Sequence, residues 1–412
     1  MKKLKIIWLG FAVPDEMAKP LLEMDPSPAI QTHKFGWSFA RALQRGFGEV
    51  TLVSSCPVQN FPLVRRISFT GATFNSHGMQ GITLGFINLF LLKHLTRLLA
   101  CLVTALPTIS RERIDWIFIH GVHTPYLIFG LIARHLGCSM AVVVTDPPGV
   151  ILTTDGTAAR LMKRVDTWLI RKFLRHADVV FALAPDLVRD LAPGRPRLVF
   201  PGVLESTLAD HVCTFERASA KSATRPFTIM YAGGLSHAYG VDRLIEAVVM
   251  LPRSVSVCLK LYGRGDQEVR IRQLADQDSR FIYGGFVDTA TLMPELCAAD
   301  ILINPRPTSE LFATQSFPSK LIEYLATGRP VLTTRITSIP DELREHFYYI
   351  DDESAEGIHL AICAVMAMSA SDRAELGFAA RQFVRTNYSE AATGRRIAEF
   401  IDALNSKAKR NN

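Results

Sequence analysis

A lysine and a glutamate stand three residues apart in the run SFPSKLIEYLATGRPV. Ser316 and Pro318 predict the start of a helix in this run, and Gly328 predicts its end. A helix N-terminus binds phosphate through its free N–H groups and the positive end of its dipole. Lys320 adds a cation there, and Glu323 lies on the same face, placed to hold ribose hydroxyls. The alternative is an ordinary surface ion pair between these two side chains.

Glycine and arginine residues follow three other apolar segments in the same half of the chain. Gly233 and Gly234 follow the first segment, and tandem glycines let the backbone approach a ligand closely. Arg264 follows the second segment between two glycines, and Arg306 follows the third. Neither glycine turn matches a dinucleotide-binding or phosphate-loop motif, so a plain tight turn is the alternative. Because parallel strands end at one edge of a sheet, we expect both arginines to gather there with Lys320.

Two histidines and an aspartate stand in similar places in the first half of the chain. His120 and His123 follow one apolar segment, and Asp146 follows the next, beside two prolines that fix its backbone. These side chains are placed to face a ligand at the ends of the strands. The alternatives are structural imidazoles for the histidines and a turn-capping carboxylate for Asp146.

Short apolar segments rich in β-branched residues alternate with helical patterns along the chain. Nearly continuous apolar segments are typical of parallel strands that are buried on both faces. Two such series, separated by the polar stretch 205–226, predict an α/β fold of two doubly wound domains facing a ligand cleft. The predicted strands are 5–9, 50–54, 116–120, 140–145, 179–183, 198–201, 228–233, 257–262, 281–284, 301–304, 330–333 and 348–351, and the clearest helices are 158–175, 240–250 and 318–326.

Composition narrows the class of protein. The chain has 412 residues, 48% of them hydrophobic and 21% charged, which fits two globular domains and excludes a disordered chain. The net charge of +7 is uneven, with +9 in residues 1–205 and −2 in the remainder, so the first half favours anionic partners. Seven scattered cysteines argue against a disulfide framework and a zinc site and fit a reduced cytoplasm. The apolar start is expected to be a buried strand rather than a secretory signal.

Two segments of the first half have membrane-like composition. Residues 81–109 are apolar but carry Lys93, His94 and Arg97 in their middle. Charges at the centre of a spanning helix are costly, so a buried or surface-lying helix is expected. Residues 158–176 mix basic with apolar residues, which is typical of a helix at an anionic bilayer surface; the alternative is that both segments pack on the sheet. The basic residues of the second segment are Arg160, Lys163, Arg164, Arg171, Lys172 and Arg175.

Four stretches of the second half resemble the nucleotide-binding domain of family 4 retaining glycosyltransferases with the GT-B fold. They are YAGGLSHAYGVDRLIEAV, LKLYGRGD, FIYGGFVDTATLMPELCAADILINPR and FPSKLIEYLATGRPVLTT, and they occur in the family's order. The first half matches in layout, and the end of the chain resembles the family's last helix, which crosses back onto the first domain. The resemblance predicts an acceptor-binding domain over 1–205, a linker over 206–226, a nucleotide-sugar-binding domain over 227–388 and a crossing helix over 389–412.

The resemblance also implies roles for individual residues. It implies transfer of a sugar from a nucleoside diphosphate sugar with retained anomeric configuration and without a metal. Glu323 would bind the ribose and Lys320 the diphosphate, while the backbone of Phe286 and Val287 would meet the nucleobase. Asp146 falls where many members have a histidine near the donor sugar.

The chain departs from the family's pattern at several positions. Where the family commonly has an arginine and a lysine, this chain has Gly234 and Tyr239. Gln315 replaces the first of two paired glutamates, and its amide is able to hydrogen-bond a sugar hydroxyl. Arg264 and Arg306 are candidates to replace the missing charges.

We therefore expect a retaining, metal-independent glycosyltransferase of surface polysaccharide or glycoconjugate synthesis, with no cofactor. Its expected partners are a nucleotide-sugar donor, a glycan or polyprenyl-linked acceptor and an anionic membrane surface, at the inner face of the cell membrane in the cytoplasm; no nucleic-acid motif is present. The alternatives are an epimerase or phosphorylase on the same fold, or a non-catalytic glycosyltransferase-like subunit. The predicted catalytic residues are Asp146, Arg264 and Lys320; the donor-binding residues are Gly233, Gly234, Phe286, Val287, Arg306, Gln315, Ser319 and Glu323; the acceptor-side residues are His120 and His123.

Overall fold

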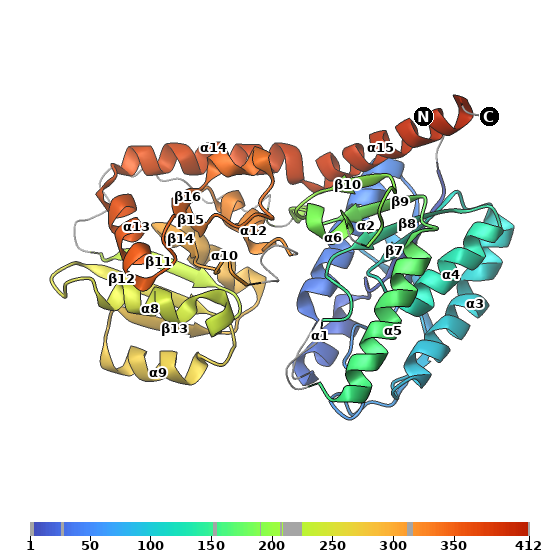
Figure 1. Cartoon of the computed structure of the whole chain (residues 1–412), viewed down its shortest axis with the longest axis horizontal. Coiled ribbons are helices and arrows are strands. Elements are labelled where there is room, and N and C mark those ends of the chain that lie inside the picture. Colours follow the sequence, from blue (N-terminus) through green and yellow to red (C-terminus); the bar gives the residue numbers. More distant parts are fainter. Residues whose placement is uncertain are drawn as a thin grey trace. The chain divides into compact units, whose positions relative to one another are not determined.

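The computed structural model describes residues 4–25, 29–150, 155–189, 191–206, 208, 225–310 and 316–410. The chain divides into two compact units (Figure 1). Unit 1 comprises Met1–Val203 with Glu390–Asn412, and unit 2 comprises Leu204–Ser389. Each unit is built on a largely parallel sheet, so the predicted α/β class with two doubly wound domains is confirmed.

The sheet of unit 1 has eight strands in the order β10-β9-β8-β7-β1-β2-β5-β4. All neighbours are parallel except β4 and β5, which form an antiparallel hairpin at one edge. The central strands are buried along their whole length, as the continuous apolar segments predict. The strands are β1 Ile6–Gly10, β2 Val50–Ser54, β4 Ala72–Ser76, β5 Met79–Thr83, β7 Trp116–His120, β8 Ser139–Val144, β9 Val179–Ala182 and β10 Arg197–Val199; β3 Ser68–Phe69 and β6 Phe86–Ile87 form a separate small sheet.

Helices cover both faces of this sheet and give unit 1 two cores. Helices α3 (Leu92–Glu112), α4 (Thr124–His135) and α5 (Thr157–Leu174) pack on one face through residues such as Ile109, Phe129 and Ile170. On the other face lie α2 (Ile30–Phe47) and α15 (Glu390–Arg410). The remaining helices of unit 1 are α1 (Asp15–Met24) and α6 (Pro185–Arg189).

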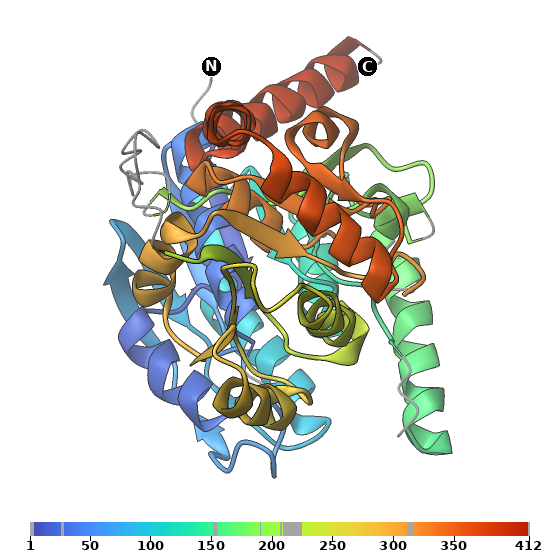
Figure 2. The ribbon, with the colours of Figure 1, turned by 90° about the vertical axis from the view of Figure 1, so that its left-hand side faces the viewer.

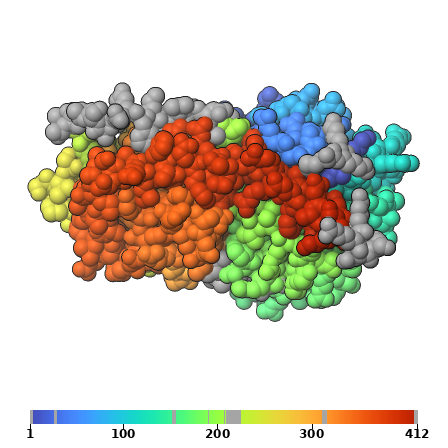
Figure 3. Space-filling model, turned by 90° about the horizontal axis from the view of Figure 1, so that it is seen from above, coloured from blue at the N-terminus to red at the C-terminus, as the bar shows by residue number. Residues whose placement is uncertain are grey.

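The last helix is held in unit 1 by close packing along α2, and Figure 3 shows its red surface beside the blue residues of the first helices. Gly46 and Gly394 meet at the crossing, where a Cβ on Gly394 would lie 2.2 Å from the Ala42 carbonyl oxygen. The largely buried Arg41 guanidinium donates to the Glu390 carboxylate at 2.6 Å. Glycines and a buried ion pair therefore fix this helix on unit 1.

The sheet of unit 2 has six parallel strands in the order β13-β12-β11-β14-β15-β16. The chain runs outward from β11 to β13 and then returns to the other side of β11, so the topological switch lies between β11 and β14. In doubly wound sheets ligands bind at this point, beyond the carboxyl ends of the strands. The strands are β11 Phe227–Ala232, β12 Val257–Tyr262, β13 Phe281–Gly285, β14 Ile301–Asn304, β15 Val331–Thr334 and β16 Tyr348–Ile350.

Two cores enclose this second sheet. Helices α8 (Val241–Val249), α9 (Glu268–Gln277) and α13 (Ala355–Ala367) pack on one face. Helices α10 (Thr289–Ala298), α12 (Lys320–Thr327) and α14 (Ala370–Tyr388) pack on the other. Two short 3-10 turns, η1 (His237–Tyr239) and η2 (Asp341–His346), complete the unit.

Two sequence expectations differ from the structure. Residues 81–109 do not form one helix, because β5 runs to Thr83 and α3 begins only at Leu92. The buried Asn88 side chain between them donates to the carbonyls of Gln59, Val64 and Arg66 and fixes a loop there. The scattered cysteines predict no disulfide framework; among the described cysteines five are free and Cys297 is disulfide-bonded.

Candidate functional site

Two glycine loops pack backbone against backbone at the carboxyl ends of β11 and β12. Gly233 has a φ of +153° and Gly263 a φ of +137°, values that favour glycine. A Cβ on Gly263 would lie 1.8 Å from the Gly233 carbonyl oxygen, and one on Gly265 would lie 2.1 Å from that of Leu235. The Tyr231 hydroxyl donates to the carbonyl of Gly234 at 2.8 Å. These glycines are required by the close approach of two loops, which is more than an isolated tight turn needs.

Helix α12 brings Lys320 to these loops. The helix begins at Lys320 after Ser319, whose side chain makes no capping hydrogen bond, so the predicted cap at Ser316 is wrong. Ser316 instead accepts hydrogen bonds at its carbonyl from Arg306 and Ser338. The helix ends where predicted, with Gly328 in the left-handed conformation at a φ of 76°.

The ammonium of Lys320 lies 3.9 Å from the centroid of the Tyr231 ring, a cation–π contact. It is also 3.0 Å from the place that a Cβ on Gly233 would occupy, so the glycine leaves room for it. Burial, followed by the positive charge of Arg306, lowers the pKa of Lys320 to about 7. The surroundings of Lys320 thus disfavour its charged form.

Arg306 supplies the second cation at the topological switch. It follows β14, is 5% exposed and donates to the Ser316 carbonyl at 3.3 Å. Its guanidinium lies 5.9 Å from the centroid of the Tyr239 ring. Burial lowers the pKa of Arg306 to about 10. Arg306 and Lys320 are close enough to influence each other's charge, as their place at one sheet edge predicts.

Tyrosines that the sequence analysis did not select hold this arrangement together. The buried Tyr324 hydroxyl accepts from the backbone N–H of Ala232 at 2.7 Å and donates to the carbonyl of the same residue at 3.0 Å. These two hydrogen bonds join α12 to the end of β11. Tyr324 stands next to Glu323 in the same run, and its polar hydroxyl on the buried face of a helix is the feature that could have drawn attention to it.

Glu323 is half-buried one turn into α12. Its carboxylate is close enough to favour the charged form of Lys320, whose ammonium lies 3.9 Å from the centroid of the Tyr231 ring. Gln315, the remaining predicted contact of this run, lies outside the described residues.

Arg264 and Phe286 form a separate exposed pair near the loops. The Arg264 guanidinium stacks 4.7 Å from the centroid of the Phe286 ring, which is 50% exposed. The Arg264 carbonyl accepts a hydrogen bond from Leu235 at 2.8 Å, so its backbone belongs to the paired glycine loops. Val287 follows, half-buried. The stacked ring and guanidinium present a flat, cationic face of the kind on which a nucleobase stacks.

The predicted residues of the first half belong to unit 1. His120 is 1% exposed, stacked on Trp8 at 5.2 Å, and neither ring nitrogen has a hydrogen-bond partner. Burial lowers the pKa of His120 to about 3, so its ring is neutral. His123 is exposed at the start of α4 against Phe11, and Asp146 is exposed after β8. His123 and Asp146 are thus accessible, whereas His120 is enclosed by aromatic rings.

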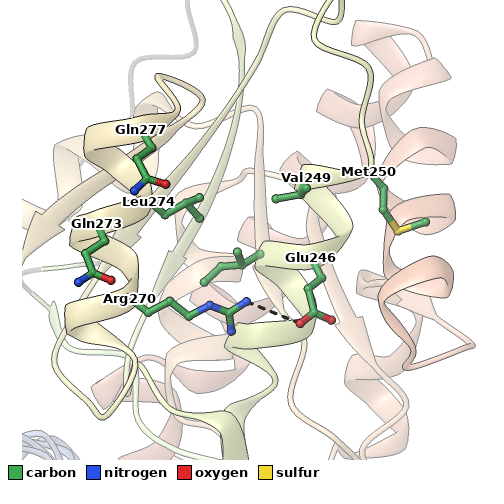
Figure 4. A pocket seen from close by; sticks show the side chains of 8 residues that line it. Glu246, Val249, Met250, Arg270, Gln273, Leu274 and Gln277 are labelled. Atoms are coloured by element: carbon green, nitrogen blue, oxygen red, sulfur yellow. Dashed lines mark ion pairs between the residues drawn. The ribbon is translucent and has the colours of Figure 1, made fainter.

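Other features of the described residues do not overlap this site. No three His, Cys, Asp or Glu side chains of the described ranges gather as a metal site would require. An open groove of about 510 Å³ lies between α8 and α9, and Figure 4 shows the Arg270–Glu246 ion pair, 3.7 Å long, across it. The groove is lined by Ile245, Glu246, Val249, Met250, Arg270, Gln273, Leu274 and Gln277, none of them a predicted site residue.

Comparison with solved structures shows the fold. Sucrose-phosphate synthase from Thermosynechococcus elongatus superposes with a TM-score of 0.66 at 15% identity, covering 98% of this chain and 100% of that one. Anabaena HepE, solved in complex with UDP, gives a TM-score of 0.63 at 13% identity, covering 97% of this chain and 100% of that one. The shared fold is GT-B.

Comparison with curated sequences agrees. The "Putative colanic acid biosynthesis glycosyltransferase WcaL" of Escherichia coli is 24% identical over 196 residues, 46% of this chain and 48% of the relative. The amylovoran biosynthesis glycosyltransferase AmsK of Erwinia amylovora is 27% identical over 187 residues, 44% of this chain and 46% of the relative. The chain thus spans about half the length of the curated relatives it matches.

Two protein-family models match the chain, one in each unit. The "Glycosyl transferase 4-like domain" matches residues 36–199, in unit 1, and "Glycosyl transferases group 1" matches residues 226–368, in unit 2. The second match contains both glycine loops, Arg306 and Lys320. Sequence, fold and site agree, and the chain belongs to the group 1, or family 4, glycosyltransferases.

Proposed function

We propose that this chain transfers a sugar from a nucleoside diphosphate sugar to a glycan or lipid-linked acceptor in polysaccharide synthesis. The observation that carries the proposal is Lys320, a half-buried cation that lies on a tyrosine ring beside paired glycine loops. The names of WcaL and AmsK, both polysaccharide glycosyltransferases, and the UDP complex of HepE support the choice of donor and pathway class.

In this proposal unit 2 stabilises the leaving diphosphate. Lys320, Arg306 and the first N–H groups of α12 place positive charge where the negative charge of the diphosphate grows as the glycosidic bond breaks. Gly233 and Gly263 let phosphate oxygens approach the backbone closely. Glu323 binds the ribose hydroxyls, and Phe286 with Arg264 stacks on the base.

We assign the transfer to the retaining, metal-independent class. The acceptor hydroxyl attacks from the face that the diphosphate leaves, and a diphosphate oxygen takes the acceptor's proton. The new glycosidic bond forms as the bond to the diphosphate breaks, and the proton leaves on the diphosphate. Asp146 is proposed to contact the donor sugar, and His123 the acceptor.

The test is consumption of nucleotide sugar with and without acceptor, together with the anomeric configuration of the product. Epimerisation needs no acceptor, and a non-catalytic subunit consumes nothing. The double variant Arg264→Ala with Lys320→Ala should abolish turnover, because it removes one charge from each side of the donor site.

The matched control for the lysine is Lys260→Ala. Lys260 lies on β12 of the same unit, and its ammonium is paired with the Glu295 carboxylate at 2.6 Å. The control should keep near-wild-type turnover. Equal turnover in the double variant and the control would reject the proposed role of the cations.

A further inference from the structure

In the first turns of helix α3, charged side chains face the protein and apolar side chains are exposed. The lysine and the arginine of these turns point inward: Lys93 and Arg97 are each 5% exposed. The Lys93 ammonium donates to the Val58 carbonyl at 2.5 Å and to the Asn60 side chain at 3.0 Å. Arg97 donates to the Cys56 carbonyl at 2.8 Å and lies 4.4 Å from the centroid of the Phe86 ring. Polar groups therefore occupy the protein side of the first turns of this helix, and Cys101, Ala105 and Ile109 continue that side into the core.

The opposite face of α3 is apolar and exposed. Leu95 is 53% exposed, Leu99 is 49% and Val103 is 74%. Their spacing of four residues places them in one stripe along the helix. A helix on a water-exposed surface normally has the reverse arrangement, so this face is built for an apolar environment.

Helix α5 has a second exposed apolar row with arginines beside it. Leu161 is 63% exposed, Val165 is 49% and Trp168 is 60%, at helical spacings of four and three. Arg160, Arg164 and Arg171 form the adjacent row and are all exposed. An apolar row flanked by basic residues is typical of a helix that lies in a bilayer interface.

The two lysines of α5 contact other side chains of unit 1. Lys163 is paired with Asp155 at 2.6 Å, and Lys172 lies 5.5 Å from the centroid of the Trp168 ring. The Asp166 carboxylate on the same helix accepts from Thr124 at 2.5 Å. The arginine row therefore carries positive charge outward beside the apolar row.

The two apolar rows belong to one layer of unit 1. Helices α3 and α5 both contact α4 and both pack on the same core, and Figures 1 and 2 show α5 at the outside of the unit. We name the stripe Leu95, Leu99 and Val103, the row Leu161, Val165 and Trp168, and the arginines Arg160, Arg164 and Arg171 together the α3–α5 surface.

We propose that the α3–α5 surface docks on an anionic lipid bilayer. Apolar rows on two helices of one layer, each packed against α4, provide an area that enters the acyl boundary, and the arginines meet lipid phosphates. A bilayer explains both features, since it offers hydrocarbon and negative charge at adjacent depths. Helix α3 is also the one helix among the described residues whose length and hydropathy would suit a membrane span, yet its inner face is committed to the core of unit 1. The helix therefore lies on the membrane rather than across it.

Trp168 reports on the docking without any substitution. The chain has four tryptophans, and Trp8, Trp37 and Trp116 are at most 4% exposed. Adding vesicles rich in phosphatidylglycerol should shift the emission to the blue and protect it from an aqueous quencher. Pure phosphatidylcholine vesicles should give a smaller shift, and salt should reverse it.

Flotation of the full chain with the same vesicles tests each part of the surface. Arg160→Gln, Arg164→Gln and Arg171→Gln together should lower binding to anionic vesicles roughly 100-fold, since each basic residue is worth about fivefold. Leu95→Ser, Leu99→Ser and Val103→Ser together should lower binding to every vesicle. All six positions are exposed, so circular dichroism and thermal unfolding should match the wild type.

Matched controls lie in unit 2. Arg253→Gln, Arg270→Gln and Arg385→Gln remove the same charge from exposed positions, and Val269→Ser, Leu360→Ser and Phe378→Ser remove exposed apolar side chains. Both controls should bind vesicles like the wild type.

Equal losses in variants and controls would overturn the proposal. So would a wild-type dimer in light scattering that the Leu95, Leu99 and Val103 variant dissociates, which would make this face a contact between copies. None of these measurements needs donor or acceptor, so they stand apart from the transferase assay.

Discussion

Each unit of this protein has a pair of cations that are at least half-buried, and the two pairs differ in what holds them. In unit 1 the Lys93 ammonium donates to two oxygens, and Arg97 donates to a third. In unit 2 Lys320 rests on the ring of Tyr231 beside Gly233, with no hydrogen bond from its ammonium among the described residues. Burial lowers the pKa of both lysines to about 7. A lowered pKa therefore does not distinguish a structural lysine from a ligand-binding lysine. What distinguishes Lys320 is the hydrogen-bonding capacity that its ammonium leaves unused beside Gly233.

The largest expected contrast is in nucleotide affinity. Lys320→Met should weaken binding of UDP or GDP by roughly 2–3 kcal/mol, because a charge-assisted hydrogen bond to phosphate is lost. Lys93→Met should leave the affinity unchanged, because that ammonium is already occupied by the protein. Isothermal titration calorimetry of both variants measures this. Equal losses would mean that the two lysines do not differ in role.

The same two variants should change stability in opposite directions. Lys93→Met leaves the Val58 carbonyl and the Asn60 side chain without their donor and should cost about 1–3 kcal/mol of unfolding free energy. Lys320→Met removes a charge that burial destabilises and should raise the stability of the empty protein by roughly 1 kcal/mol. Thermal unfolding without ligand compares them. A destabilised Lys320→Met would place this lysine among the structural cations.

Much of this fold could be predicted from the sequence, because buried parallel strands leave continuous apolar segments. The predicted strands at 228–233, 257–262 and 301–304 match β11, β12 and β14 to within a residue. The prediction of one helix over 81–109 was wrong because the strand and helix residues are equally apolar there. Periodicity alone does not separate a short buried strand from a helix. The turn that divides them depends on Asn88, whose three hydrogen bonds reach residues at least 22 positions away.

The candidate site was predictable in part for a similar reason. Arg306 and Lys320 could be placed together because strand order brings their segments to one edge. Their aromatic supports, Tyr231 and Tyr239, depend on side-chain packing that no spacing encodes. The inward turn of Lys93 and Arg97 on α3 was likewise hidden, since a cation in an apolar run is expected to reach water.

A smaller effect is expected from pH. Lys320 in the empty site loses its proton near pH 7, and a bound diphosphate raises its pKa again because opposite charges attract. Binding above pH 7 therefore takes up a proton, and affinity should fall as the pH rises, by at most about tenfold per pH unit. Calorimetry between pH 7.5 and about 9 in buffers of different ionisation enthalpy measures the uptake. A Lys320→Met variant with the same pH dependence would assign the proton to another group.

The smallest effect separates two arginine–aromatic pairs within unit 2. Arg264 lies 4.7 Å from the Phe286 ring centroid, and Arg272 lies 4.4 Å from that of Tyr283. The geometries are similar, but only Arg264 belongs to the paired glycine loops, whereas Arg272 is bound to Glu268 at 2.8 Å. Exposed cation–π contacts are worth about 0.5–1 kcal/mol, so Arg264→Ala should weaken nucleoside diphosphate binding roughly two- to fivefold. Arg272→Ala should have a smaller effect, because Arg272 contacts the loops indirectly, through the Tyr283 ring, whose hydroxyl donates to the Gly263 carbonyl at 3.0 Å. Nucleobase stacking at Phe286 also predicts that Arg264→Ala affects a nucleoside diphosphate more than inorganic diphosphate, and equal losses for both ligands would place Arg264 on the phosphates instead.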